Sequence, residues 1–423
     1  MVVDRRPVRL WITFVLAALF VGKPAWGSSG NALPRATSEA LGMADANVAL
    51  AAGPAAQFIN PANILDSGKE SRWEAGALLG GVFPTFTRDA AAGAAATGEH
   101  AAKTTYPMVP YAAMTFPLSD RVAWGFAADS PYGLRSEWKD HQFDLNLGPL
   151  GTADLAQAAE LKTVRLGPAA ALRLDDAWSL GARGFVQYVE ALEENDIYSV
   201  KGDGTSFGGQ IGIRFASEDF KFGAAYTSRT NTEIKGTLGG IHPVASASLV
   251  AGDAKANILL PDRLQTGMAF RLRPELWWEI DLDWIGWAYV DELSIYQANG
   301  ALANAGKNAR HNEDTLSVRT GVQWKHSPHL TLYAGVGYDP TPVPERDVAP
   351  TQGMLRKTRI AFGGAYATES GLKLGVTYQY VRGHPRRVGA TDQDSFGGSD
   401  THLYEGTYES ESHILGISLA GEF

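Results

Sequence analysis

An alternation of apolar and polar residues with a period of two is the feature that most constrains what this chain can fold into. In residues 372–380, Leu, Leu, Val, Tyr and Tyr occupy the even positions, and Lys, Gly, Thr and Gln occupy the odd ones. The same pattern recurs in 278–284, 316–325, 359–366 and 415–423. Successive side chains of a strand point to opposite faces, so each stretch predicts a strand with one apolar and one polar face.

The connections between these strands alternate in length. Six short turns lie at 117–120, 174–177, 216–219, 272–275, 325–328 and 367–370, and seven long polar stretches lie near 88–103, 134–159, 190–206, 230–263, 289–314, 340–356 and 384–410. Outer-membrane barrels have short periplasmic turns, long extracellular loops and an even number of strands. The pattern therefore predicts an all-β, fourteen-stranded antiparallel transmembrane β-barrel.

Charged residues on the polar faces argue against a soluble β-sandwich or propeller, the competing architectures. They form a predicted lumen charge network of Glu279, Asp281, Asp283, Arg319, Lys325, Arg359 and Lys373. Charges are almost never fully buried unless they are paired, and a barrel gives them a polar interior. We expect the acidic face of 279–283 to neighbour the basic face of Arg319 and Lys325.

The chain begins with the pattern of a secretory signal peptide. Three arginines at 5, 6 and 9 precede an apolar run over 10–21, and Ala25-Trp26-Gly27 fits a cleavage site. Residues 1–27 carry a net charge of +3, so removing them takes the chain from −9 to −12. We expect a signal peptide at 1–27, an N-terminal plug or hatch at 28–70 and the barrel at 71–423.

The hatch is predicted from composition and from size. It is rich in alanine and lacks strand-like alternation, and a fourteen-stranded barrel leaves an internal space that a plug would fill. Its end, Asn60-Pro61-Ala62, forms a predicted rigid corner because proline fixes φ and extends the residue before it. We expect this corner to gate the lumen, and the alternative is a plain loop between a short helix and a strand.

A second candidate site lies at Asp129-Ser130-Pro131-Tyr132-Gly133. Proline removes a ladder donor and glycine allows a bend, so this segment predicts a break in the barrel wall and a lateral opening. Alternatively, it marks only the start of a loop. We expect the corner at 60–62 to lie beside this strand.

Composition and motifs argue against several other classes of function. The chain has no cysteine, so it has no disulfide or thiolate site, and its acidic charge argues against nucleic acid as a partner. The G-x-S-x-G stretch at 204–208 lacks the following helix of a nucleophile elbow, and the nine histidines show no H-x-x-x-H spacing. We therefore expect no metal, no cofactor and no enzyme activity.

An ordered set of motifs resembles the FadL-type outer-membrane transporters of long-chain fatty acids and aromatic hydrocarbons. The set comprises Phe58-Ile59-Asn60-Pro61-Ala62, Asp129-Ser130-Pro131-Tyr132-Gly133 with Glu137-Trp138, Leu260-Pro261-Asp262, Asp283-Trp284, Tyr338-Asp339-Pro340 and the stretch 413–423. The resemblance implies a barrel in the bacterial outer membrane, plugged by a hatch. It also implies capture of a hydrophobic molecule near the extracellular loops and lateral release at the third strand.

The chain departs from this family where basic residues would hold a carboxylate, since no such motif is recognisable. That departure favours an uncharged hydrocarbon over a fatty acid. The alternative functions are a general porin for polar solutes and a barrel lipase. The expected partners are a hydrophobic small molecule and outer-membrane lipid, with no nucleic acid, and the expected state is a monomer.

Overall fold

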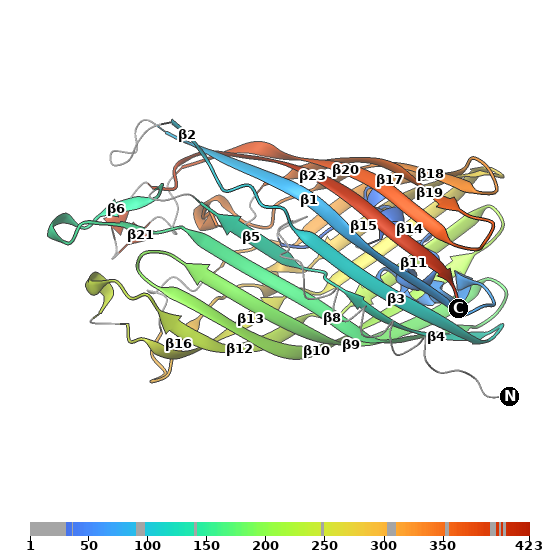
Figure 1. Cartoon of the computed structure of the whole chain (residues 1–423), viewed down its shortest axis with the longest axis horizontal. Coiled ribbons are helices and arrows are strands. Elements are labelled where there is room, and N and C mark those ends of the chain that lie inside the picture. Colours follow the sequence, from blue (N-terminus) through green and yellow to red (C-terminus); the bar gives the residue numbers. More distant parts are fainter. Residues whose placement is uncertain are drawn as a thin grey trace.

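The computed structural model describes residues 31–35, 37–89, 98–138, 142–246, 249–302, 310–351, 355–389, 395–396, 399–400 and 403–423. The expected signal peptide at 1–27 lies outside these residues. Within them, fourteen antiparallel wall strands close into a tilted barrel (Figure 1), which confirms the predicted fold. No helix in this part of the chain has the length and apolar character needed to cross a bilayer.

Eleven wall strands are continuous and three are each broken into two segments. In order they are β1 (Arg72–Arg88), β3 (Met108–Ser119), β4 (Val122–Asp129) with β5 (Gly133–Glu137), β8 (Ala158–Arg173), β9 (Trp178–Glu194), β10 (Ser199–Ala216), β11 (Phe220–Thr227) with β12 (Thr230–Gly239), β13 (Gly252–Leu260) with β14 (Arg263–Arg273), β15 (Leu276–Ile285), β17 (Thr315–Lys325), β18 (Leu330–Asp339), β19 (Lys357–Ala367), β20 (Lys373–Val388) and β23 (Gly406–Glu422). The barrel closes where β1 pairs with β23, from Arg72 opposite Glu422 to Arg88 opposite Gly406.

The two faces of the wall follow the sequence alternation. On β19 the outward Ile360 and Phe362 are 51% and 58% exposed, whereas the inward Arg359 is only 1% exposed. Aromatic rings gather at the short-turn end, where the C-terminal Phe423 stacks at 6.0 Å from Phe116. Outward apolar residues and an aromatic belt are what a lipid-facing barrel surface requires.

Two stretches that we expected to be long loops are mostly strand. β9 and β10 are joined by residues 195–198 alone, and most of 230–263 forms β12 and β13. The strands continue beyond the apolar band with polar residues on both faces, such as the Lys162 and Glu190 pair at 3.1 Å. The prediction of long loops at 190–206 and 230–263 is therefore wrong, because a strand without an apolar face resembles a polar loop in sequence. The stretch Gly204–Gly208 lies inside β10 and is followed by more strand.

Smaller elements build a cap at the long-loop end. They are β2 (Gly98–Ala101), β6 (Asp144–Asn146), β7 (Thr152–Asp154), β16 (Ile295–Gln297), β21 (Ser395–Phe396), β22 (Ser399–Asp400) and the 3₁₀ helices η3 (Gly148–Leu150), η4 (Pro243–Ala245), η5 (Trp287–Tyr289) and η6 (Glu345–Asp347). The cap has its own apolar core, which includes Phe86 and Phe143, and the Arg88 guanidinium lies 5.5 and 5.6 Å from the centres of these two rings.

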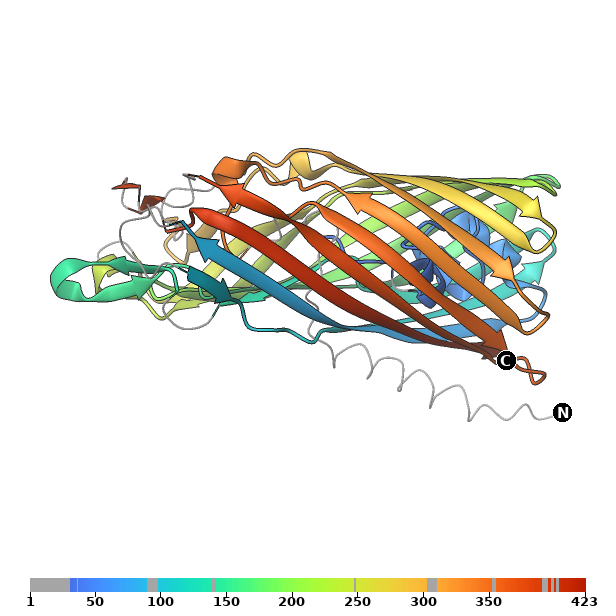
Figure 2. The same ribbon diagram turned by 90° about the horizontal axis from the view of Figure 1, so that it is seen from above.

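The described hatch residues lie inside the barrel near its short-turn end (Figures 1 and 2). They form the helix α2 (Ser38–Gly42) and the 3₁₀ helices η1 (Pro54–Phe58) and η2 (Pro61–Ser67). Thr37 caps α2 by accepting a 3.0 Å hydrogen bond from the Ala40 N–H. The wall offers glycine where the hatch approaches most closely, since a Cβ on Gly335 would lie 2.3 Å from the Met43 backbone.

Candidate functional site

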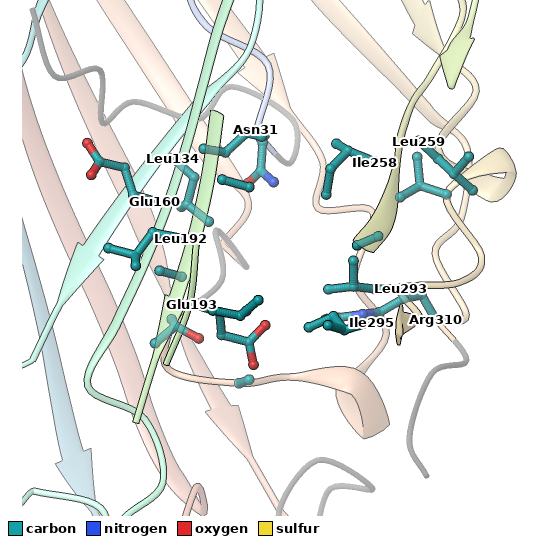
Figure 3. Close-up of a pocket in the computed structure, with 18 of the residues that line it drawn as sticks. Asn31, Leu134, Glu160, Leu192, Glu193, Ile258, Leu259, Leu293, Ile295 and Arg310 are labelled. Carbon is teal, nitrogen blue, oxygen red and sulfur yellow. The ribbon is translucent and has the colours of Figure 1, made fainter. Parts of the chain in front are cut away.

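A cavity of about 370 Å³ lies inside the barrel beneath the cap (Figure 3). Most of its lining is aliphatic or aromatic and comes from β5, β8, β9, β13 and the loops that follow β15 and β18, including Leu134, Leu161, Leu192, Ile258, Leu259, Trp287, Leu293, Ile295 and Val343. An apolar cavity with a few polar groups is the usual form of a small-molecule site.

The three acidic side chains of the cavity already have partners. Glu160 lies 3.2 Å from Lys162 and 3.5 Å from Arg135. Glu193 accepts a 2.6 Å hydrogen bond from the Tyr198 hydroxyl, and Glu292 accepts one from Ser294. Burial and the Glu193 carboxylate raise the pKa of Tyr198 well above its ordinary value, so this hydroxyl keeps its proton and remains a donor.

Two hydrogen-bond donors of the cavity have no acceptor in the described part of the chain. The Trp287 indole Nε1 is buried without a partner. The Arg310 side chain, which points into the cavity opposite Glu193 in Figure 3, makes no hydrogen bond or ion pair of 4 Å or less to a described residue. Burial lowers the pKa of Arg310, while the charges of Glu193 and Asp347 oppose that shift. The cavity therefore favours a ligand with an acceptor at one end.

Below this cavity the barrel wall is interrupted between β3 and the strand formed by β4 and β5. Ala112 pairs with Ala128, and pairing resumes only where Ala102 lies opposite Trp138. Both pairs have the same register, so the strand leaves the wall and returns to it with no residue inserted or lost relative to its neighbour. No backbone hydrogen bond joins 104–111 to 129–136 among the residues that the structure describes. The segment at 129–133 lies at this gap.

The segment that leaves the wall pairs with the start of the hatch instead. The Leu33 N–H donates to the Pro131 carbonyl and the Gly133 N–H donates to the Asn31 carbonyl, both at 2.9 Å. The Tyr132 hydroxyl donates to the Pro261 carbonyl, between β13 and β14, at 3.1 Å, and the Tyr132 ring lies 6.1 Å from that of Trp287. The hatch, the gap and the cavity thus meet at Tyr132.

The corner at Asn60-Pro61-Ala62 lies elsewhere on the wall. Asn60 is extended, with φ −142° and ψ 108°, and its Oδ1 accepts a 3.1 Å hydrogen bond from the Ala62 N–H. Its Nδ2 donates to the Ile213 carbonyl of β10 at 2.9 Å. The expectation that this corner lies beside the broken strand is wrong, because the wall glycines that admit Asn60 lie on β10 and β11, and residues 31–33 contact the break instead.

Two acidic residues of β15 hold the hatch to the wall. Glu279 accepts hydrogen bonds from the Ala49 and Leu50 N–H groups at 2.6 and 3.1 Å. Asp281 accepts from the Arg35 guanidinium at 3.0 Å and from the Val48 N–H at 3.1 Å. Both carboxylates are fully buried, and these N–H and guanidinium donors replace the water that would otherwise solvate them. Because breaking these hydrogen bonds would leave buried acceptors unsatisfied, they hold the hatch in one position.

The charges continue across the wall from β15 to β19. Arg319 donates to Asp283 at 2.6 Å and to Asp339 at 2.7 Å. Arg359 also pairs with Asp339 and lies 3.3 Å from Asp45 of the hatch. All five side chains are buried, so the alternating charges form one network inside the barrel.

Two residues of the predicted network lie outside it. Lys325 is exposed at the short turn after β17. Lys373 is half exposed at the start of β20, 3.6 Å from Glu39 of α2. Both stand at the short-turn end of their strands, where the inward face is no longer deep in the lumen.

Sequence reasoning did not predict the cavity, and it assigned neither Arg310 nor Trp287 to a ligand site. These residues come from stretches with no periodicity, and the fold alone brings them together. It also missed Arg35 and Asp45, which carry the hatch side of the charge network. The available signal for those two was their charge, shared with Glu39, in an alanine-rich segment.

Comparisons with known proteins agree with this architecture. The family model described as "Outer membrane protein transport protein (OMPP1/FadL/TodX)" matches residues 19–423. The chain is 21% identical over 425 residues to the long-chain fatty acid transport protein of Escherichia coli K12, covering 88% of this chain and 92% of that protein. It is 21% identical over 322 residues to the Salmonella typhi protein of the same name, covering 66% and 71%.

Solved structures share the fold at lower identity. A Pseudomonas aeruginosa FadL homologue superposes with a TM-score of 0.76 at 17% identity, covering 93% of this chain and all of that one. The Pseudomonas putida toluene transporter TodX superposes with a TM-score of 0.69 at 15% identity, covering 93% and 99%.

Proposed function

This chain belongs to the outer membrane protein transport protein family (OMPP1/FadL/TodX), and from that premise we propose how it moves its substrate. The protein is a transporter of the bacterial outer membrane and not an enzyme. A hydrophobic small molecule enters from the long-loop end and binds in the cavity beneath the cap. It then leaves sideways, through the gap between β3 and the broken strand, into the lipid.

The observation that carries this proposal is the interrupted ladder beside the cavity. The gap is bounded by the Ala112–Ala128 and Ala102–Trp138 pairs and lies at the level of Tyr132, whose ring contacts the cavity residue Trp287. A molecule leaving the cavity at Tyr132 therefore reaches the interrupted ladder at the point where residues 31–33 of the hatch pair with the broken strand.

The hatch and the physics of apolar solutes argue against a general porin. Each CH₂ group exposed to water costs about 0.8 kcal/mol, so moving a twelve-carbon chain through an aqueous lumen costs on the order of 10 kcal/mol. A lateral exit avoids most of this cost. The lumen below Tyr132 is also filled by the described hatch residues, many of which are fully buried. We assign residues 28–70 to the hatch and 71–423 to the barrel, which acts as a monomer surrounded by lipid.

The curated relatives are named for long-chain fatty acids, and the structural relative TodX is named for toluene. The preference for an uncharged hydrocarbon, drawn from the absence of a basic motif, is revised by the cavity. Arg310 and Trp287 offer two donors without acceptors in the described part of the chain. An arginine forms a strong charge-assisted hydrogen bond with a carboxylate, so we propose that long-chain carboxylates bind there with the head group at Arg310.

The lateral route is tested with cysteines at Pro110 and Ser130, which lie opposite each other across the gap in the register of the flanking pairs. The chain has no native cysteine, so a bifunctional methanethiosulfonate reagent joins only the introduced pair. We expect the bridge to stop uptake of radiolabelled dodecanoate and toluene by cells and to leave dodecanoate binding by the purified protein unchanged.

The matched control places cysteines at Val186 and Phe207, which pair across the continuous β9–β10 ladder with outward side chains. Bridging this pair should leave uptake unchanged. If the bridge across the gap also leaves uptake unchanged, the lateral route is wrong.

The role of Arg310 is tested by the Arg310→Gln variant. Loss of a charge-assisted hydrogen bond weakens binding by roughly 1.5–3 kcal/mol, so we expect dodecanoate affinity to fall at least tenfold and dodecanol affinity to stay constant. Arg310→Lys should restore much of the loss. Equal weakening of the acid and the alcohol would show that Arg310 shapes the cavity and does not bind the head group.

A further inference from the structure

A continuous row of ion pairs runs along the outside of the wall at the long-loop end. In order, its members are Lys103, Glu137, Arg135, Glu160, Lys162, Glu190 and Lys201, and the successive N···O distances are 2.6, 3.3, 3.5, 3.2, 3.1 and 3.5 Å. The row starts after β2 and crosses β5, β8, β9 and β10, which follow one another along the wall (Figure 1). Its first pair lies at the end of the gap, where the Lys103 N–H donates to the Glu137 carbonyl at 2.7 Å.

The side chains of this ion-pair row face away from the lumen. Leu134, Leu161 and Val200 line the cavity, so the residues beside them on β5, β8 and β10 point to the other side of the wall. Glu160 borders the cavity, but its carboxylate points away from it in Figure 3. Lys201, at one end of the row, has a side chain that is 63% exposed. The row is therefore accessible from outside the barrel.

The ion-pair row borders the apolar surface that faces lipid. On β8, β9 and β10 the outward residues closer to the short-turn end include Leu172, Val186 and Phe207, all of which are exposed. Polar head groups flank the hydrocarbon core of a bilayer on each side. The row therefore lies at the level of the head groups of the outer leaflet.

The ion-pair row has more hydrogen-bond donors than acceptors. Each of its carboxylates lies between two cations, whereas Lys103 and Lys201 at the ends each pair with one carboxylate of the row. Ammonium and guanidinium groups carry more N–H donors than a carboxylate has oxygens. Four cations and three carboxylates give the row a net charge of +1. Such a surface favours an anion that is rich in acceptors, and phosphate binds these cations through charge-assisted hydrogen bonds.

We propose that the ion-pair row binds an outer-leaflet glycolipid whose sugar head group carries more than one phosphate. Neighbouring strands lie about 4.8 Å apart, so the part of the row on β5 to β10 spans roughly 14 Å, which is wider than a single phosphate group. The carboxylates hold the cations in position before the lipid binds, and this reduces the entropy cost of binding. The acyl chains then lie along the outer face of the wall beside the gap. This inference goes beyond transport and does not depend on the lateral route.

The test measures binding of diphosphoryl lipid A to the purified full-length protein in detergent, by titration followed with native mass spectrometry. The double variant Lys162→Gln/Lys201→Gln removes two cations of the row, so we expect its affinity for lipid A to fall about tenfold or more. Lys162→Arg/Lys201→Arg keeps both charges and should bind as the parent does. Phosphatidylglycerol, which has one phosphate, should bind the parent about tenfold more weakly than diphosphoryl lipid A does.

The matched control is Lys235→Gln/Lys255→Gln. These two lysines lie opposite each other on β12 and β13, and they face outward because their neighbours Ile234 and Ala256 line the cavity. The control removes the same charge outside the row, so its affinity for lipid A should equal that of the parent. An equal loss in both double variants would show that the lipid is attracted only by overall charge, and this would overturn the proposal.

Glu190→Gln supplies an opposite expectation. It removes the carboxylate between Lys162 and Lys201, so we expect diphosphoryl lipid A to bind more tightly, whereas a purely structural role of the row predicts weaker or unchanged binding. The proposal is also overturned if Lys162→Gln/Lys201→Gln binds lipid A as the parent does. Equal affinity for phosphatidylglycerol and diphosphoryl lipid A would overturn the assignment to a glycolipid. None of these outcomes bears on the proposed function, which is tested by uptake across the bridged gap.

Discussion

Replacing Glu279 by glutamine will loosen the hatch without unfolding the barrel. The carboxylate accepts two backbone hydrogen bonds, from Ala49 at 2.6 Å and from Leu50 at 3.1 Å, and it is fully buried. A glutamine has one acceptor oxygen, so it keeps one of these bonds as a neutral one and turns a donor toward the other N–H.

The magnitude follows from those two bonds. Hydrogen bonds to a charged group contribute roughly 1.5–3 kcal/mol each and a neutral one about 0.5–1.5 kcal/mol. The loss is reduced because Glu279 lies on the same inward face as Asp281, and neutralising one of two like charges relieves their repulsion. We expect a net loss of about 2 kcal/mol, which corresponds to a change of about 30-fold in the opening equilibrium.

Native-state hydrogen exchange on the purified protein measures this equilibrium directly. The Ala49 and Leu50 amides should exchange about 30-fold faster in Glu279→Gln, by the same conversion. The matched control is Asp283→Asn on the same strand, because Asp283 is bound by Arg263 and Arg319 of the wall and accepts no hydrogen bond from a described hatch residue. Unchanged exchange at 49 and 50 in Glu279→Gln, or equal acceleration in the control, would refute the reasoning.

Two further predictions concern closure of the lumen by the hatch. Gly212→Ala should displace the hatch corner at a cost of roughly 1–3 kcal/mol, because its Cβ would lie 2.0 Å from the Asn60 Oδ1, and should therefore raise ion conductance in planar bilayers. The control Gly184→Ala has open space at its Cβ and should leave the conductance unchanged. Equal conductance in both variants would contradict this prediction. Deleting Gly30–Ile64 should leave a folded barrel that leaks small polar solutes, because the wall ladder closes without the hatch; a folded deletion variant with the conductance of the parent would show that the hatch does not seal the lumen.

The wall was predictable because its information is local. A period of two fixes which face of each strand meets lipid, and the short turns fix how neighbouring strands are joined. The prediction of strands failed where they extend above the membrane, because stretches such as 190–206 are polar on both faces and resemble loops in sequence. Strand and loop are not distinguished by hydrophobicity once neither face is buried in lipid.

The site was less predictable because its parts are brought together only by closure of the barrel. The Pro131 and Gly133 pattern marked a weak point in the wall, but its pairing with Asn31 joins residues about a hundred positions apart. Asp281 and Arg319 could be placed on adjacent inward faces from alternation, whereas the Arg35 contact to Asp281 depends on how the hatch folds inside. Nothing near Arg310 in the sequence distinguishes it from any other loop arginine.

The seam between β1 and β23 has a consequence for how the molecule is made. Arg72 and Glu422 are paired at 2.5 Å although they are 350 residues apart in sequence, and the ladder between them continues to Arg88 and Gly406. Until the last strand is available, β1 is an unpaired edge that attracts other chains, and long-range pairing of this kind is slow. The buried bonds from Glu279 and Asp281 to the hatch form only inside the ring. A chain truncated before Gly406 lacks the strand that pairs with β1, so its wall stays open on that side of the hatch.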